Sequence, residues 1–134
     1  TGKDCNGSYP SSAQGGGKPG KSYHGRGYIQ LTWDYNYKAA SAALLGDENI
    51  LLNNPEKVLE EELAWRTAAW YWKTHVHTVA DVVAGKFGAS TKAINGALEC
   101  SGGKNEKAVK RFEFYKTILK AFKVDEEPIE TGCY

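Results

Sequence analysis

The densest run of polar and aromatic side chains in the sequence lies at residues 23–37. Within it, Gln30, Thr32 and Asn36 carry neutral hydrogen-bond donors and acceptors, and Tyr35 is one of several flat aromatic rings. Amides bond to sugar hydroxyls and N-acetyl groups, and aromatic rings stack on sugar rings, so such a surface binds a neutral sugar without desolvating a charge. These residue types favour a carbohydrate-binding surface, although a structural turn leading into a helix would have a similar composition.

Metal, thiol and nucleophile chemistry has weaker support. His75 and His77 are two positions apart, so they point in different directions on a helix, and no further His or Cys lies near them in the sequence. The Cys-x-x-Cys spacing of zinc and redox sites is absent. A nucleophilic pair of His24 with Cys5 or Cys100 is conceivable, but Cys5 lies in a glycine-rich segment with nothing to activate its thiol. We therefore expect neither a metal nor a cofactor.

Charge and hydropathy restrict the partners. The 134 residues include 17 Lys and Arg against 16 Asp and Glu, a net charge of +1, which predicts no attraction to nucleic acid or to an anionic membrane. No apolar run approaches the roughly 18 to 20 residues of a transmembrane helix. An uncharged polymer is the expected partner. Because the chain begins at Thr1, lacks Met and has three Cys, we interpret it as a processed chain or fragment whose odd thiol is free or pairs outside it.

The pattern of glycines and apolar residues predicts one all-α domain of four or five helices with long irregular loops. Residues 1–27 hold eight of the fifteen glycines and few aliphatic residues, so they are expected to form a loop, with the run at 15–17 its most mobile part. Residues 28–134 are expected to form the helical body, opened by a short extended piece at 28–32. The expected helices are 34–44, 54–73, 78–84, 90–98 and 105–122.

Helix ends and one apolar stripe give sharper expectations. Asp34 is the expected cap of the first helix and Gly46 its end, while Thr78 and Ser90 are expected to open later helices. Three- and four-residue spacing aligns a stripe that we interpret as a buried core face rather than a sugar-stacking surface. The stripe consists of Trp65, Ala68, Ala69, Trp72 and Val76.

Short motifs resemble those of one family, in the same order along the chain. Residues 23–37 are similar to YxGRGPIQLSxNYNY, residues 51–55 to LLNNPD, and residues 70–72 to WFW. Residues 94–100 resemble INGGLEC, residues 111–116 RIGFYKR, and residues 132–134 the terminal DCY. This set resembles glycoside hydrolase family 19, the plant-class endochitinases, from about Tyr23 to the C-terminus. The resemblance implies a lysozyme-like, mainly α-helical fold and chitin as the substrate.

The resemblance implies roles for individual residues. Gln30 and Asn36, with Tyr35, would line the sugar cleft, and Asn95 would help to hold the sugar and the nucleophilic water. Thr32 stands where the family usually has a Ser that positions this water, and its hydroxyl can do the same.

A second set of implied roles concerns support and cross-linking. Glu99 and Arg111 match a charge pair that supports the family's catalytic acid. Cys100 and Cys133 match a family disulfide, which would stabilise the fold by roughly 3 to 4 kcal/mol in the chain-entropy account.

The departures from the family pattern affect catalysis. An inverting glycosidase needs two carboxyl groups roughly 6.5 to 9.5 Å apart, and both family glutamates precede the position of Cys5, one of them in a His-Glu dipeptide that this sequence lacks. The acidic run 60–62 is expected to be a solvated helix face, and Asp34 is a weak candidate for a replacement base. Gly15 stands where the family has an aromatic residue, and the glycine run replaces the Cys that pairs with the counterpart of Cys5.

Three functional hypotheses follow. The favoured one is a secreted, defence-related chitinase relative that recognises chitin or N-acetylglucosamine oligosaccharides and does not hydrolyse them alone. The first alternative is the C-terminal lobe of an active endochitinase that hydrolyses β-1,4-linked N-acetylglucosamine polymers with inversion, with Cys5 bonded to a second chain. The second alternative is a lysozyme-like hydrolase of peptidoglycan, which shares the fold class.

Overall fold

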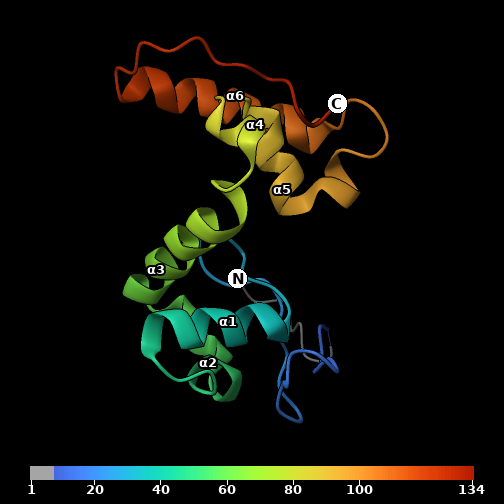
Figure 1. The fold of residues 1–134 in the computed structure, drawn as a ribbon, viewed down its shortest axis with the longest axis vertical. Helices are drawn as coiled ribbons and strands as arrows, with labels where there is room; N and C mark the ends of the chain where they lie inside the picture. Colours follow the sequence, from blue (N-terminus) through green and yellow to red (C-terminus); the bar gives the residue numbers. More distant parts are fainter. Residues whose placement is uncertain (1–7) are drawn as a thin grey trace. The chain divides into compact units, whose positions relative to one another are not determined.

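The all-α prediction is confirmed. A computed structural model describes residues 8–134, and this part of the chain contains six α-helices and two isolated β-bridges but no β-strand. The chain divides into two compact units, Thr1–Tyr71 and Trp72–Tyr134 (Figure 1). No helix of the described residues is both long enough and apolar enough to cross a membrane.

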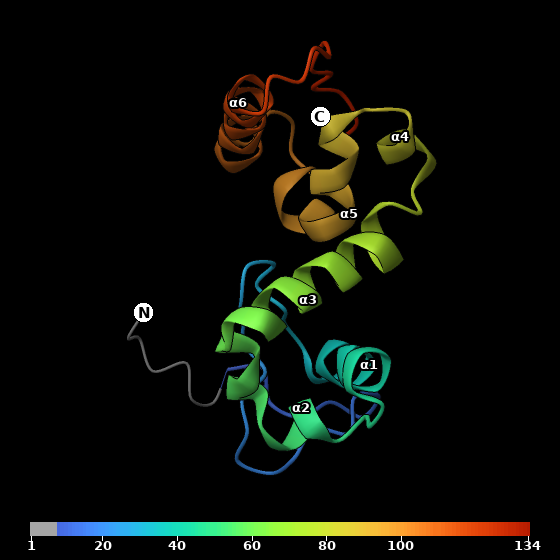
Figure 2. The same ribbon diagram turned by 90° about the vertical axis from the view of Figure 1, so that its left-hand side faces the viewer.

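The first unit packs short helices around two buried tyrosines. Its helices are α1 (Asp34–Leu45), α2 (Ile50–Asn53), a 3₁₀-helix (Pro55–Leu59) and α3 (Glu61–Tyr71). Helices α1 and α2 lie side by side (Figures 1 and 2). Burial of apolar surface here supplies the main stabilising force. The core consists of Tyr23, Leu31, Tyr37, Ala40, Leu51, Leu52, Val58 and Leu63.

The predicted helix boundaries of this unit are partly right. Gly46 ends α1 in the left-handed conformation, with φ of 76°, as its lack of a side chain allows. Asp34 is the first helical residue rather than the cap, which is Trp33. The predicted helix 54–73 is broken at Glu60, whose backbone is extended, and α2 was not predicted because its four residues are too few to show a period.

The predicted core stripe is right for Val76, which is buried, and wrong for Ala69 and the two tryptophans, which are exposed. Trp65 is 59% exposed and Trp72 is 41% exposed. The face of α3 that packs into the core instead carries Leu63, Ala64 and Thr67. Both sets have helical spacing, so periodicity alone cannot choose between them, and the break at Glu60 sets which face turns inward.

The second unit is built on two packed helices. It contains a π-helical turn (Trp72–Val76), α4 (Ala80–Val83), α5 (Phe87–Glu99) and α6 (Glu106–Ala121). Phe87 of α5 stacks on Tyr115 of α6 with ring centroids 4.5 Å apart. After α6 the chain turns back (Figures 1 and 2), and the Phe87 amide donates to the Ile129 carbonyl at 2.8 Å.

Three predicted helix starts in the second unit have different outcomes. The last helix starts at Asn105 as predicted, and Asn105 is its cap, since its side-chain oxygen accepts from the Lys107 amide at 2.9 Å. Val79 rather than Thr78 precedes α4, and Ser90 lies inside α5, where its hydroxyl donates to the Phe87 carbonyl. A Ser or Thr near a helix start therefore resembled a cap in the sequence without being one.

Candidate functional site

A tight turn positions the first group of candidate residues. An isolated bridge joins Arg26 to Leu31, and the backbone amide of Gln30 donates to the Gly27 carbonyl at 3.3 Å across the turn. Gln30 itself has a φ of 58°, in the left-handed region. The extended piece predicted at residues 28–32 is therefore wrong, because the chain reverses direction there.

Gln30, Thr32 and Asn36 form an amide cluster on this turn and the first turn of α1. The Gln30 side-chain amide donates to the Gly27 carbonyl at 2.9 Å. The Thr32 hydroxyl donates to the Gln30 carbonyl at 2.8 Å, and the Asn36 side-chain amide donates to the Thr32 carbonyl at 2.8 Å. The amide oxygens of Gln30 and Asn36 accept no hydrogen bond from the described residues. The cluster therefore presents fixed, neutral acceptors at a partly exposed surface.

Backbone strain marks the same segment. Gln30 and Trp33 both have positive φ, of 58° and 73°, although neither is a glycine. Such conformations cost about 1 to 3 kcal/mol each and persist where the surroundings enforce them, often at functional sites. The strained residues lie on either side of Thr32, and the carbonyl of one of them, Gln30, accepts from the Thr32 hydroxyl at 2.8 Å.

Exposed aromatic rings adjoin the amide cluster. Trp33 and Tyr35 are 41% and 45% exposed and stack with an interplanar angle of 9° and centroids 6.3 Å apart. Tyr9 meets Trp33 edge-on, with centroids 4.7 Å apart. Because aromatic rings at interfaces supply area at low entropic cost, this group is suited to stacking against a ligand. Tyr35 is the residue of this group that the sequence singled out.

Asp34 is buried and structural. It is 0% exposed, and its carboxylate accepts from the Ser12 amide and hydroxyl at 2.6 Å each, from the Gly17 amide at 3.0 Å and from the Tyr35 amide at 2.9 Å. Burial raises the pKa of Asp34, but the hydrogen bonds from Ser12, Gly17 and Tyr35 outweigh it and hold the pKa below its usual value. A carboxylate enclosed by donors cannot reach a water, so Asp34 does not serve as the replacement base.

Two glycines of the run 15–17 contact this carboxylate, Gly15 by close packing and Gly17 by a hydrogen bond. Gly15 is buried, and a Cβ added to it would lie 2.0 Å from the Asp34 carboxyl carbon. The Gly15 amide also donates to the Ser12 hydroxyl at 3.0 Å. Contrary to the expectation of a mobile loop, the run is tied to Asp34. An aromatic residue, which the family carries at Gly15, would not fit against Asp34.

The second unit holds a charged network. Glu99 is 3% exposed and accepts two bonds from Arg111, from Nε at 2.9 Å and from Nη2 at 2.8 Å, together with one from the Asn95 amide at 2.8 Å. The hydrogen bonds from Arg111 lower the pKa of Glu99, against the opposing effect of burial. The pairing predicted for Glu99 and Arg111 is present, and Asn95 joins it from four positions earlier on α5, where the backbone of Asn95 departs from helical values.

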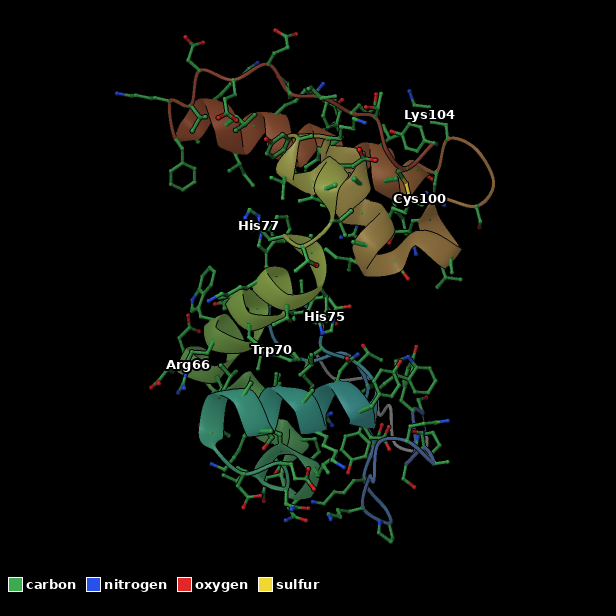
Figure 3. The ribbon with its side chains drawn as sticks, viewed as in Figure 1. Arg66, Trp70, His75, His77, Cys100 and Lys104 are labelled. Atoms are coloured by element: carbon green, nitrogen blue, oxygen red, sulfur yellow. A yellow bond between two sulfur atoms is a disulfide. The ribbon has the colours of Figure 1, made fainter. Side chains whose placement is uncertain are left out.

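A pocket and a disulfide lie in the same unit. The predicted Cys100–Cys133 disulfide is present (Figure 3), with Cα atoms 4.8 Å apart. The pocket has a volume of about 260 Å³, and Arg111, Ser90 and Thr91 supply its polar groups. Its apolar walls are formed by Trp72, Phe87, Ile94, Phe114, Tyr115 and Ile118.

One aromatic pair was missed by the sequence analysis. Tyr28 and Trp65, 56% and 59% exposed, lie with ring centroids 4.3 Å apart, and we call them the Tyr28–Trp65 shelf. The Tyr28 hydroxyl and Trp65 Nε1 both donate to Glu61, at 3.0 Å and 2.9 Å. The four-residue spacing of Glu61 and Trp65 on a helix was the signal that could have revealed half of this contact.

Two other predictions concern histidine and cysteine. His75 and His77 lie apart on their segment (Figure 3), and no cluster of three His, Cys, Asp or Glu side chains in residues 8–134 could hold a metal ion. Cys5, which the sequence suggested as a link to a second chain, lies outside the described residues.

The described residues form a helical protein whose surface presents neutral amides and exposed aromatic rings. A family model described as chitinase class I matches residues 2–87. The chain therefore belongs to the chitinase class I family, glycoside hydrolase family 19.

Curated relatives and solved structures agree with this family. The chain is 44% identical over 117 residues to acidic endochitinase SP2 of Beta vulgaris, and 42% identical over 110 residues to chitinase 5 of Oryza sativa subsp. japonica. These alignments cover 87% and 81% of this chain and 36% of each relative, so the chain spans about a third of their length.

Two solved structures show the same fold. A family GH19, class IV chitinase from Zea mays matches with a TM-score of 0.78 and 31% identity over 95% of this chain and 61% of its own. Chitinase C from Streptomyces griseus HUT6037 matches with a TM-score of 0.67 and 36% identity, covering 80% of this chain and 44% of its own.

Proposed function

We propose that this chitinase-related chain binds chitin or N-acetylglucosamine oligosaccharides and does not hydrolyse them by itself. The observation that carries the proposal is the amide cluster, in which Gln30 and Asn36 are fixed by backbone hydrogen bonds and keep their amide oxygens open to a ligand. An N-acetyl group donates through its N–H, and sugar hydroxyls donate as well, so fixed acceptors suit both. The adjoining Trp33 and Tyr35 rings would stack on the sugar faces.

The absence of hydrolysis by this chain is inferred from its carboxylates. Inverting hydrolysis needs one carboxyl group as the acid and another as the base. Asp34 and Glu99 are both buried and engaged by several donors, and the chain contains no His-Glu dipeptide of the kind that carries the family acid. We assign Glu99, Arg111 and Asn95 a positioning role and Thr32 the role of orienting a water or a sugar hydroxyl.

A second candidate function has one observation in its favour. The network of Glu99, Arg111 and Asn95 is complete, with a bidentate contact between Glu99 and Arg111. Such a network is useful where a catalytic acid must be held next to Arg111. In a longer protein that supplies both catalytic carboxyl groups, this chain would form part of an endochitinase that hydrolyses β-1,4-linked N-acetylglucosamine polymers with inversion.

The binding proposal is tested by titration calorimetry with N-acetylglucosamine oligosaccharides. Gln30→Ala and Asn36→Ala are each expected to weaken binding about five- to thirtyfold, since a lost hydrogen bond to the ligand costs about 1 to 2 kcal/mol. Asn53→Ala, which removes an exposed amide from α2, is the matched control and should leave binding unchanged. Affinity should hardly depend on salt, because neutral-sugar contacts release no counterions.

Other results would contradict the proposal. Absence of heat with every oligosaccharide, or full affinity in both amide variants, would remove the binding function. Turnover of the oligosaccharides by the chain alone would contradict the inactive assignment. Preferential cleavage or binding of peptidoglycan fragments would favour the lysozyme-like alternative instead.

We also propose that the protein is secreted. The Cys100–Cys133 disulfide is typical of proteins that fold in an oxidising compartment. A second chain bonded through Cys5 remains a proposal of its own, which the intact mass of the natural material under non-reducing conditions would test.

A further inference from the structure

The Tyr28–Trp65 shelf is a preformed aromatic surface that the proposed sugar contacts do not include. Its rings are 4.3 Å apart at an interplanar angle of 34°. The Tyr28 hydroxyl donates to both Glu61 oxygens, at 3.0 and 3.2 Å, and Trp65 Nε1 donates to one of them at 2.9 Å. Because these bonds hold two exposed rings in one orientation, a ligand that lies on them freezes little further side-chain motion.

Glu61 differs from its neighbours in the acidic run. Glu60 pairs with Lys57 at 3.3 Å and Glu62 pairs with Arg66 at 3.1 Å. Among residues 8–134, no cationic side chain lies within ion-pair distance of Glu61. An ionised carboxylate accepts several hydrogen bonds, so Tyr28 and Trp65 do not exhaust Glu61. The shelf therefore combines aromatic faces with a negative charge that nothing in the described residues neutralises.

This combination is complementary to a cation carried on a partly apolar ring. Aromatic faces attract cations through the ring quadrupole and also stack on apolar C–H surfaces. An ammonium group beside a carboxylate forms a charge-assisted hydrogen bond. Among the sugars of a chitin chain, a unit that has lost its acetyl group carries an amine, which takes up a proton and has the charge that the shelf lacks.

We propose that the Tyr28–Trp65 shelf and Glu61 bind a protonated glucosamine unit of partly deacetylated chitin. The apolar face of the sugar lies on the two rings, and its ammonium group donates to Glu61. This inference rests on the proposed function, because it adds one subsite for a charged unit to a surface that binds the neutral chain. A fully acetylated unit brings the same apolar face without the charge, so Glu61 confers the discrimination.

The position of the shelf links it to the amide cluster. Tyr28 and Gln30 belong to one tight turn, which is closed by the hydrogen bond from the backbone amide of Gln30 to the Gly27 carbonyl. The family motif that residues 23–37 resemble has Pro at the position of Tyr28. Proline has neither an aromatic face nor a hydroxyl that could reach Glu61, so the shelf is a feature of this chain rather than of the family pattern.

The test is calorimetry on the full chain with two probes, the hexasaccharide of glucosamine at mildly acidic pH and the hexasaccharide of N-acetylglucosamine. Glu61→Gln is expected to weaken glucosamine binding about three- to tenfold, the range for one exposed cation–π and ion-pair contact. It should leave N-acetylglucosamine binding unchanged. Glu62→Gln removes the same charge one position away, from a carboxylate already paired with Arg66, and should leave both affinities unchanged.

Two variants of Tyr28 keep the proposal testable if Glu61→Gln perturbs folding. Tyr28→Phe keeps the ring and removes one donor to Glu61, so glucosamine binding should persist, while Tyr28→Pro should weaken it as much as Glu61→Gln does. Thermal unfolding of each variant checks the fold.

Four results would overturn the proposal. These are unchanged glucosamine binding in Glu61→Gln, an equal loss in Glu62→Gln, an equal loss for both sugars in Glu61→Gln, and equally tight, Glu61-dependent binding of an oligolysine peptide. Absence of N-acetylglucosamine binding to the unaltered chain would instead contradict the proposed function. The glucosamine measurement would still test the shelf, because the two sugars are titrated separately.

Discussion

Asp34 in the first unit and Glu99 in the second are both buried carboxylates, and the two units satisfy them by different means. Within residues 8–134, Asp34 accepts from neutral donors, the backbone amides and one hydroxyl. In the second unit, Glu99 is held by the guanidinium of Arg111 and the amide of Asn95. Through its neutral donors, Asp34 fixes the backbone of the loop that carries Ser12 and Gly17. Glu99 instead orients the side chain of its charged partner, Arg111, which lines the pocket of the second unit.

This difference has a physical basis. Gathering backbone amides around a carboxylate fixes the loop that carries them, because each amide belongs to a different residue of that loop. A bidentate guanidinium fixes only the side chain that bears it, with two parallel bonds that determine its plane. The first arrangement suits a loop that must support the amide cluster, and the second suits a functional side chain.

The largest expected effect concerns the disulfide of the second unit. Replacing Cys100 and Cys133 together with Ser should destabilise the second unit by about 3 to 4 kcal/mol, because the bridge closes a loop of 33 residues. Hydrogen exchange resolved by segment should show lost protection in α5 and α6 and little change in α1. Equal losses of protection in both units would contradict the expectation that the units are stabilised independently.

Removing the charged partner should have the next largest effect. Arg111→Ala leaves Glu99 buried with Asn95 as its remaining side-chain donor, at an expected cost of about 2 to 4 kcal/mol, discounted because the Arg111 side chain is 46% exposed. Denaturant unfolding measures it. Lys86→Ala is the matched control, since its pair with Asp81 is exposed on both sides and should contribute less than about 1 kcal/mol. Similar losses in the two variants would show that burial of Glu99 does not matter.

Replacing the acceptor of the first unit should cost somewhat less. Asp34→Asn turns one acceptor oxygen into a donor that faces other donors, at an expected cost of about 1 to 3 kcal/mol. Hydrogen exchange should show the loss chiefly at Ser12 and Gly17, whose amides donate to Asp34. Asp47→Asn, at an exposed position, is the control. An unchanged loop would mean that the neutral donors do not need a charge.

The smallest expected effect concerns acid. The folded-state pKa of Asp34 and that of Glu99 lie below their ordinary values of 3.8 and 4.5, so the stability they contribute is present above those values and is lost as pH falls through the folded-state pKa. Because Arg111 is the first cause of the lowering at Glu99, Arg111→Ala should move that titration to higher pH. Carboxyl resonances followed by NMR should show an unchanged titration midpoint for Asp34 in this variant. A shifted midpoint for both carboxyl groups would mean that Arg111 does not act on Glu99 alone.

Much of this organisation was predictable from residues with local effects. Gly46 ends α1 and Asn105 caps α6 because both act within one turn of their own position. The pairing of Glu99 with Arg111 and of Cys100 with Cys133 came from the family resemblance, since no local pattern in a single sequence specifies a contact across 12 or 33 positions.

The missed features depend on distant segments. Gly15 and Asp34 are 19 positions apart, and only the folded chain shows that the glycine leaves room for the carboxylate. Tyr28 and Trp65 meet because the turn and α3 pack within one unit, whereas periodicity assigned Trp65 to the core. Helical spacing identifies which residues share a face but not which face is buried.

The returning C-terminal segment affects how the protein should be handled. It is attached to the beginning of α5 by the bridge between Lys86 and Ile129 and to the end of α5 by Cys133. A strong thiol reductant added to a buffer acts on any disulfide it can reach, including this one. Purification should therefore rely on an alkylating agent rather than on a reductant, because alkylation blocks free thiols and leaves the Cys100–Cys133 bond intact.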